Sequence, residues 1–366
     1  MNNKTPRYII SILCIALIAL SIYYNPDVIR VRTYEEITAN EPPSFTGIIK
    51  IWQVSSWRVG QSSKTLVLLD VAQEFEKKHK MLYIEVEILS YEDYIRKTSQ
   101  GIYPDVLSFP AEMKLDFDKC TDIIITSALD GIYQKSYEAS HYKTIPWLAT
   151  SSVVLVNSKY ASKENCNTEK QQSNIQIAES MDKLSTSSDY VYGSPTAMIP
   201  LAISEVALET KPLPMSEYSS WLAFARKESR IIYGCVWQTY AMDRLISKEK
   251  GFSTEYVYPH VDSPVFFWTQ NFCVLSNDIE KNRMIFEYFD LVLSDKWQTK
   301  IAESTVSFSV TDVDMSYTGV LSEIDKNANS KVAIIPGLGI TDDEIIKALS
   351  GDEHAKLLLK EKLVFY

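Results

Sequence analysis

The stretch from Gly47 to Pro110 constrains the fold most, because it switches twice between the periodicities of strands and helices. Residues 48–52 are a short apolar run rich in β-branched side chains, which is typical of a buried strand. Apolar side chains then recur at i, i+3, i+4 and i+7 from Leu68 to Phe75, which places them on one helix face. Residues 83–89 alternate between apolar and polar side chains, as a strand does.

A second helix and a third strand complete the pattern. Ser90 is expected to cap a helix in which Asp93 favours the positive end of the helix dipole. Pro104 then leads into a strand over residues 105–109. Strands and helices that alternate with short connections predict right-handed crossovers and a parallel sheet. Ligands meet such sheets at the carboxyl ends of the strands, so we expect residues 53–60 and 108–111 to face a ligand.

The order and spacing of these segments resemble the extracellular solute-binding proteins of ABC importers, in particular the sugar-type family 1. The resemblance is carried by a first strand that contains Trp52, then LVLLDVAQEFEKK, a YEDYIRK helix and PDVLSF, and it extends over residues 47–310. It implies an α/β, two-lobed, periplasmic-binding-protein-like (type II) fold. It also implies an extracytoplasmic protein that captures a small solute, a sugar or oligosaccharide, between its lobes.

The same resemblance implies a domain organisation. The segments IPWLATSSVVLVNSKY and VFFWTQNFCVL would be hinge crossings near residues 145–157 and 262–276. Lobe 1 would then comprise residues 47–156 plus 276–366, and lobe 2 residues 157–275. In lobe 2 the patterns predict strands at 190–193 and 231–237 and helices at 201–208, 218–225 and 240–246, with Ser216 as a cap. Further helices are expected after Asp278 and over 343–363.

The amino-terminal residues predict a membrane anchor. Residues 8–24 carry no charge and follow Lys4 and Arg7; their length is at the short limit for a spanning helix. No small-residue cleavage site follows the run, and Leu13 stands where lipidation of Cys14 would need a small residue. We expect an uncleaved signal anchor within residues 1–24, a linker over 25–46, and a single-pass protein of the cell membrane with its main domain extracytoplasmic. Lipidation of Cys14 is the alternative.

Composition excludes several classes of function. The 47 acidic and 37 basic residues give a net charge of −10, which disfavours nucleic acid as a partner. The chain lacks a nucleophile elbow, a zinc-protease motif, a P-loop and a dinucleotide fingerprint, and its four histidines are far apart. We therefore expect no catalytic residues, no metal and no cofactor, and we predict that the protein is not an enzyme. The five cysteines lack zinc spacing and argue against a disulfide framework, although they leave one disulfide open.

Tryptophan placement supplies the candidate ligand site. Indole rings fall in the loop after the first strand, in both crossings and near a strand end of lobe 2, where each could stack on the apolar face of a sugar ring. Nearby Ser and Gln side chains would supply directional hydrogen bonds. The predicted ligand-binding residues are Gln53, Ser55, Ser56, Trp57, Ser108, Trp147, Trp237, Gln238 and Trp268. The alternative is that these tryptophans stiffen the hinge and the lobe cores.

Two functions of different class are consistent with these features. The first is a monomeric solute-binding protein whose partners are a small-molecule solute, the permease subunits of an ABC importer, and the membrane through residues 8–24. The second is a membrane-anchored ligand-sensing or structural accessory domain with the same fold and no transport role. The absence of a lipobox and the low count of 11 glycines favour the second, because few glycines leave few loops where backbone can approach a ligand closely.

Overall fold

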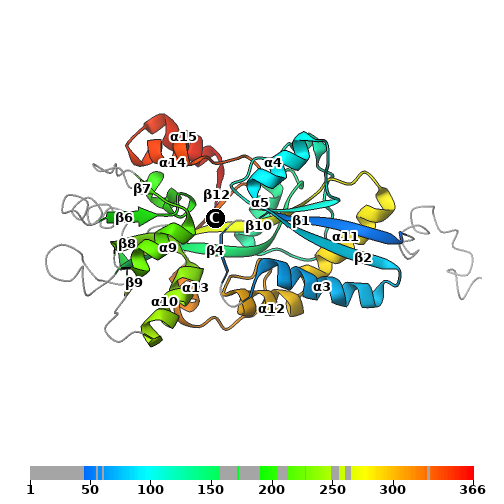
Figure 1. Ribbon diagram of the computed structural model, residues 1–366, viewed down its shortest axis with the longest axis horizontal. Coiled ribbons are helices and arrows are strands. Elements are labelled where there is room, and N and C mark those ends of the chain that lie inside the picture. Colours follow the sequence, from blue (N-terminus) through cyan, green and yellow to red (C-terminus); the bar gives the residue numbers. More distant parts are fainter. Residues whose placement is uncertain are drawn as a thin grey trace, which may run out of the picture. The chain divides into compact units, whose positions relative to one another are not determined.

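The computed structural model describes residues 45–54, 57–59, 62–156, 171–172, 190–204, 213–226, 228–248, 255–259, 265–327 and 330–366. Helices and strands alternate along this part of the chain (Figure 1). The strands are β1 (Gly47–Val54), β2 (Leu82–Leu89), β3 (Val106–Pro110), β4 (Ile145–Val156), β5 (Gln171–Gln172), β6 (Tyr190–Gly193), β7 (Leu213–Pro214), β8 (Ser229–Cys235), β9 (Glu255–Pro259), β10 (Val265–Val274), β11 (Lys331–Ile334) and β12 (Leu363–Phe365). The α-helices are α3 (Lys64–Lys78), α4 (Tyr91–Ser99), α5 (Gly131–Ala139), α8 (Ile199–Ala202), α9 (Glu217–Ala225), α10 (Val236–Lys248), α11 (Ile279–Val292), α12 (Asp295–Thr305), α13 (Gly319–Asn327), α14 (Asp342–Leu349) and α15 (Glu353–Glu361), with short 3-10 turns η2 (Phe117–Lys119) and η3 (Thr196–Met198).

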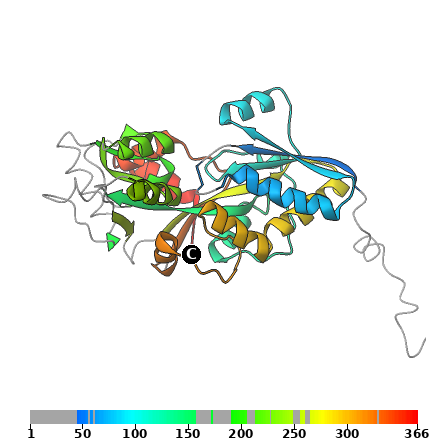
Figure 2. The same cartoon turned by 60° about the horizontal axis from the view of Figure 1, so that its bottom comes forward.

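The part of the fold that contains β1, β2 and β3, which we call the first half, confirms the predicted parallel sheet. The part that contains β6, β7 and β8 is the second half. Strand β1 lies between β2 and β3 and runs parallel to both, with Ile49 opposite Ile84 and Ile51 opposite Val106. Helix α3 buries the predicted apolar face, and Ser90 caps α4 by accepting a hydrogen bond from the Asp93 amide. Helices α3, α11 and α12 pack together on one face of this sheet (Figures 1 and 2).

Two long antiparallel strands, β4 and β10, join this half to the second half. The first part of β4 pairs with β10, up to Ser151, which lies opposite Phe267. From Ser152 onward β4 pairs with β8, and Val154 is also opposite Val257 of β9. The same strand therefore belongs to both halves, and the hydrogen-bonded path runs β2-β1-β3-β10-β4-β8-β6-β7. The predicted crossing segments coincide with these two strands, while the exact lobe boundaries stay a prediction.

In the second half, β8 pairs in parallel with β6, as the alternating strands and helices predict. Ser216 caps α9 through its side chain, as expected. The predicted strand over 231–237 is wrong at its end, because β8 stops at Cys235 and α10 begins at Val236. The Gln238 side chain accepts a hydrogen bond from the Cys235 amide at 2.5 Å, which turns the chain into the helix directly after the strand.

The carboxyl-terminal residues add strands that the sequence did not predict. Strand β11 pairs in parallel with β10, and β12 pairs antiparallel with β11. The helical segment expected over 343–363 is confirmed as two helices, α14 and α15, with Gly351 between them. Helix α14 packs against α8 and η3 of the second half. The end of the chain thus contacts both halves.

The predicted membrane anchor lies outside the described residues, and so does the linker up to residue 44. Among the residues that the structure does describe, no helix combines the length and the apolar character needed to cross a bilayer.

Candidate functional site

A buried lysine marks the carboxyl edge of the first sheet. Lys64 is the first residue of α3, after the capping residue Ser63, and it is buried. Its Nζ donates a hydrogen bond to Oε1 of Gln270 at 2.9 Å and lies 3.7 Å from the ring centroid of Trp57. Burial lowers the pKa of Lys64 to about 7, against the opposing effect of Glu217 and other acidic neighbours. Lys64 is therefore close to the balance between its charged and neutral forms at neutral pH.

Glu217, a carboxyl group from the second half, lies beside Lys64, Gln270 and Trp57, and we call this group of residues the Lys64 cluster. Glu217 is the first residue of α9, and its Oε2 accepts a hydrogen bond from the Arg58 amide at 2.8 Å. Its Oε1 accepts from the Cys235 thiol at 2.6 Å and from the Trp237 indole. Burial raises the pKa of Glu217, while these hydrogen bonds and Lys64 act in the opposite direction. Glu217 thereby ties the loop after β1 to the start of α9 and α10.

A second carboxyl group, Glu112, lies two residues beyond the end of β3. Its Oε2 is buried and has no hydrogen-bond partner within the described part of the chain. Burial raises the pKa of Glu112 to about 7; the charge of Lys64 lowers it, and Glu217 and Asp342 raise it further. A buried carboxyl oxygen without a donor is rare in proteins, because it gives up hydration without compensation.

Glu112 faces a cavity of about 630 Å³, which we call the Glu112 pocket. Its walls are the ends of β1 and β3, the start of α4, the segment 338–344 and Lys362. Gly337 and Gly339 shape the wall with φ angles of +87° and +74°, and a Cβ on either would collide with Phe117 or Lys114. The pocket is lined by Val54, Tyr91, Pro110, Glu112, Met113, Lys114, Leu338, Gly339, Ile340, Thr341, Asp342, Glu344 and Lys362.

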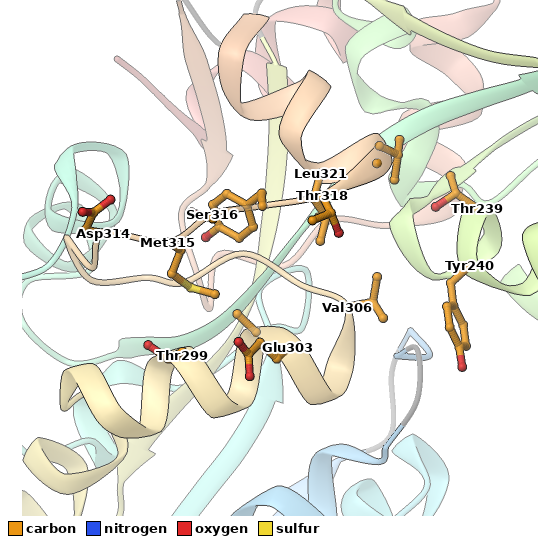
Figure 3. Close-up of a pocket in the computed structure, with 14 residues that line it drawn as sticks. Thr239, Tyr240, Thr299, Glu303, Val306, Asp314, Met315, Ser316, Thr318 and Leu321 are labelled. Carbon is orange, nitrogen blue, oxygen red and sulfur yellow. The ribbon is translucent and has the colours of Figure 1, made fainter.

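Another cavity, of about 530 Å³, lies between α10, α12 and residues 314–321 (Figure 3). Helix α12 contributes Thr299 and Glu303, and α10 contributes Thr239 and Tyr240 from the opposite side. None of the predicted site residues lines this cavity.

Three of the four predicted tryptophans lie in or beside the Lys64 cluster. The rings of Trp57 and Trp268 meet edge to face, with centroids 6.5 Å apart. Both indole N–H groups are buried and lack a hydrogen-bond partner among the described residues. Trp237 donates to Glu217 and packs edge to face against Trp221. All four tryptophans are buried, and the fourth, Trp147, lies in the core of the first half, where it stacks on Phe272.

The predicted polar residues are distributed around the same strands. Ser108 is buried and accepts hydrogen bonds from the indole of Trp147 at 3.1 Å and from the Gln270 amide at 3.3 Å. Gln53 is buried, and its Oε1 has no hydrogen-bond partner within the described residues. Gln238 is buried between Cys235 and the Glu217 carbonyl. Ser55 and Ser56 lie outside the described residues.

The charged members of the site were not predicted: Lys64, Glu112 and Glu217. A signal was present, since Lys64 and Glu217 each follow directly after a serine cap, Ser63 and Ser216. The start of a helix that follows a parallel strand lies at the ligand edge of the sheet. Glu112 is one residue beyond the predicted loop at 108–111.

Comparisons with known proteins show which solved structures have a similar fold. No protein-family model matches the chain, and no curated sequence matches it. Solved structures do match, among them the GacH receptor of Streptomyces glaucescens, with a TM-score of 0.59, 11% identity, and coverage of 87% of this chain and 97% of that one. The cyclic α-maltosyl-1,6-maltose binding protein of Arthrobacter globiformis has a TM-score of 0.54, 12% identity, and coverage of 86% and 97%. An ABC substrate-binding protein of Listeria monocytogenes has a TM-score of 0.53, 13% identity, and coverage of 87% and 97%.

At this level of identity the likeness establishes the fold. The chain has the two-lobed α/β fold of the periplasmic-binding-protein type, which confirms the predicted fold class for the described residues. The cluster of Lys64, Glu217 and the tryptophans lies where the two crossing strands connect the halves of that fold.

Proposed function

We propose that the protein is an extracytoplasmic solute-binding protein that captures a sugar or oligosaccharide between its two halves and delivers it to an ABC importer. One observation carries this proposal: aromatic and polar side chains from both halves converge beside the crossing strands. Trp57 and Lys64 come from the first half, and Glu217 and Trp237 from the second. Indole rings stack on the C–H face of a sugar, and the polar groups bind its hydroxyls.

The structural neighbours support a carbohydrate ligand. The GacH receptor was solved in complex with acarbose, and the Listeria protein in complex with cycloalternan. Contacts that a ligand makes with both halves exist only when the halves are closed around it, so the ligand shifts the population toward the closed form. We propose that permease subunits recognise this closed form and that the binding protein acts as a monomer.

The proposal includes a membrane location. Residues 8–24 would span the bilayer as an uncleaved anchor, and the linker would hold the binding domain outside the cell. The uncharged length of this run supports the placement, and a topology reporter can check it.

A second candidate function is the ligand-sensing or structural accessory domain without a transport role. The hydrogen bond from the Arg58 amide to Glu217 favours it, because this bond joins the two halves through protein groups alone. Such a bond would stabilise a closed form that needs no solute.

A binding screen distinguishes the two functions. The full-length chain in mild detergent is unfolded thermally in the presence of sugars, oligosaccharides, peptides, polyamines and anions. A ligand of the native state raises the melting temperature, and we expect a carbohydrate to do so. Titration calorimetry of Trp57→Ala should then show affinity weakened by ~1–3 kcal/mol, whereas Trp147→Phe, a change in the core, should leave affinity close to that of the parent. No response to any compound class would support the accessory function instead.

A further inference from the structure

The Glu112 pocket contains an unusual combination of groups for a site that would bind only neutral sugars. We propose that it is a subsite for a protonated amine on the carbohydrate ligand, so that the preferred ligand is an amino sugar or an oligosaccharide that contains one. This inference rests on the proposed function and specifies its ligand class. Glu112 would be the residue that accepts hydrogen bonds from the ammonium group.

The first line of evidence is the unpartnered oxygen of Glu112. Its Oε2 is shielded from solvent and receives no hydrogen bond from the described residues, and Glu112 is one of the residues that line the pocket. The carboxylates of the neighbouring groups differ in this respect: Glu217 has three donors, and Glu344 accepts from Lys362 at 2.6 Å. A ligand that supplies a donor to Glu112 would satisfy this oxygen.

The charge balance of the pocket favours a cationic donor over a neutral hydroxyl. Three carboxyl groups line it, those of Glu112, Asp342 and Glu344, against the two ammonium groups of Lys114 and Lys362. Lys362 is already engaged by Glu344 and by the Gly339 carbonyl at 2.7 Å, and Lys114 is exposed. The burial that raises the pKa of both Glu112 and Asp342 is the environment in which an added positive charge gains most.

Lys64 does not supply the hydrogen bond that Oε2 of Glu112 lacks. Its Nζ is held by Gln270 and by the face of Trp57. Its charge lowers the pKa of Glu112, but burial has the larger effect, and the pKa stays at about 7. Lys64, Gln270 and Trp57 do not line the Glu112 pocket, and we place the second cation on the pocket side of Glu112.

The shape of the pocket fits a sugar ring that carries the amine. The cavity of about 630 Å³ is within the usual range for small-molecule sites. Tyr91, which begins α4, lines the pocket and is half-exposed (48%), so its aromatic side chain can contact a sugar or an ammonium group. The wall formed by segment 338–344 leads into α14, which packs on the second half. A ligand in this pocket would therefore contact the segment that leads into a helix packed on the second half.

The test compares amino sugars with their neutral counterparts on the full-length chain in mild detergent at pH 7. Calorimetry would use glucosamine against glucose, galactosamine against galactose, and the β-1,4-linked glucosamine dimer against cellobiose. We expect at least one amino sugar to bind about tenfold or more tightly than its neutral partner. Glu112→Gln, which keeps the shape and removes the charge, should reduce that ratio to near one. Asp342→Asn should reduce it partly, and the exposed control Glu85→Gln should leave it unchanged.

Two results would overturn the inference. Equal or tighter binding of the neutral sugars, or a preference for amines that survives Glu112→Gln in a variant with the parent's melting temperature, would exclude the amine subsite and leave the proposed sugar-binding function standing. Failure of every carbohydrate, neutral or amino, to bind the parent chain would remove the inference and the proposed function together.

Discussion

At the scale of single residues, the site depends on ionisable side chains that the fold withdraws from water. Lys64 and Glu112 have pKa values moved toward each other by burial, each to about 7. Perturbed pKa values of this kind cluster at functional sites. A bound ligand can supply the polar contacts that the buried groups lost with their hydration. The Trp57 ring stabilises the Lys64 ammonium, which explains how a lysine is tolerated at the amino end of a helix, where the dipole is unfavourable for it.

The raised pKa of Glu112 predicts a specific pH dependence of stability. Between pH 4.5 and 7 the unfolded chain releases this proton while the folded chain keeps it, so the free energy of unfolding falls as pH rises. Relative to Glu112→Gln, the parent chain should lose roughly 1–3 kcal/mol across this window. Denaturant unfolding at several pH values measures it. Lys64 acts in the opposite direction above pH 7, where rising pH increases stability. A pH-independent difference between parent and Glu112→Gln would contradict the assignment.

At the level of residues, the sequence indicated which indoles come together but not the charged side chains beside them, and the ligand-binding role of the indoles stays a prediction. Trp57, Trp237 and Trp268 are placed together by strand ends and crossings that the sequence indicates. Lys64 and Glu217 have the composition of an ordinary exposed first helical turn, and only tertiary packing buries them. Trp147 shows the converse: its position in a crossing strand suggested the ligand, but this part of β4 is buried on both faces and Trp147 stacks on Phe272 in the core.

At the scale of elements, the junction between β8 and α10 positions the second-half side of the site. Gln238 folds back over Gly234, accepts from the Cys235 amide and donates to the Glu217 carbonyl at 3.3 Å. A Cβ at residue 234 would overlap the Gln238 side chain, so only glycine permits this arrangement. The sequence could not show this junction, because the requirement comes from a side chain four residues away.

Gly234→Ala should therefore destabilise the protein through Gln238. We expect a loss of about 1–3 kcal/mol, since a buried amide must move and its hydrogen bonds are broken. The double variant Gly234→Ala with Gln238→Ala should lose less than the sum of the single changes, by ~0.5–3 kcal/mol, in denaturant unfolding. Gly101→Ala is the control: its φ is +75° and no atom lies near the added methyl, so only backbone strain of ~1–2 kcal/mol is expected. Strict additivity would show that Gln238 is not the cause.

At the scale of the whole molecule, the order of strands and helices was predictable where elements that are close in the sequence also pack against each other. The parallel β1-β2-β3 unit follows from periodicity, because each element buries one regular face. Strands β11 and β12 escaped prediction because they are short, and because β11 pairs with β10, far away in the sequence, while β12 pairs only with β11 among the described strands. The contact of α14 with α8 and η3 is likewise a long-range packing event without a local signal.

The proposed orientation of the chain in the membrane gives a prediction at the same scale. Alkaline phosphatase fused after Tyr366 should be active in cells, because it folds only outside the cytoplasm, and β-galactosidase at the same site should be inactive. Placing two arginines within residues 8–24 should reverse both results, since charged residues at the centre of a span oppose insertion by roughly 2.5–3.5 kcal/mol each. Activity of the galactosidase fusion in the parent chain would contradict an extracytoplasmic domain.

Strand β4 is shared by both sheets, changing partners between Ser151 and Ser152. An extended strand cannot become longer. Any movement of one half against the other would therefore bend or twist β4 near the point where it changes partners. In the proposed closure, the two antiparallel strands would therefore allow rotation of one half against the other and would keep the side chains beside them in the same alignment.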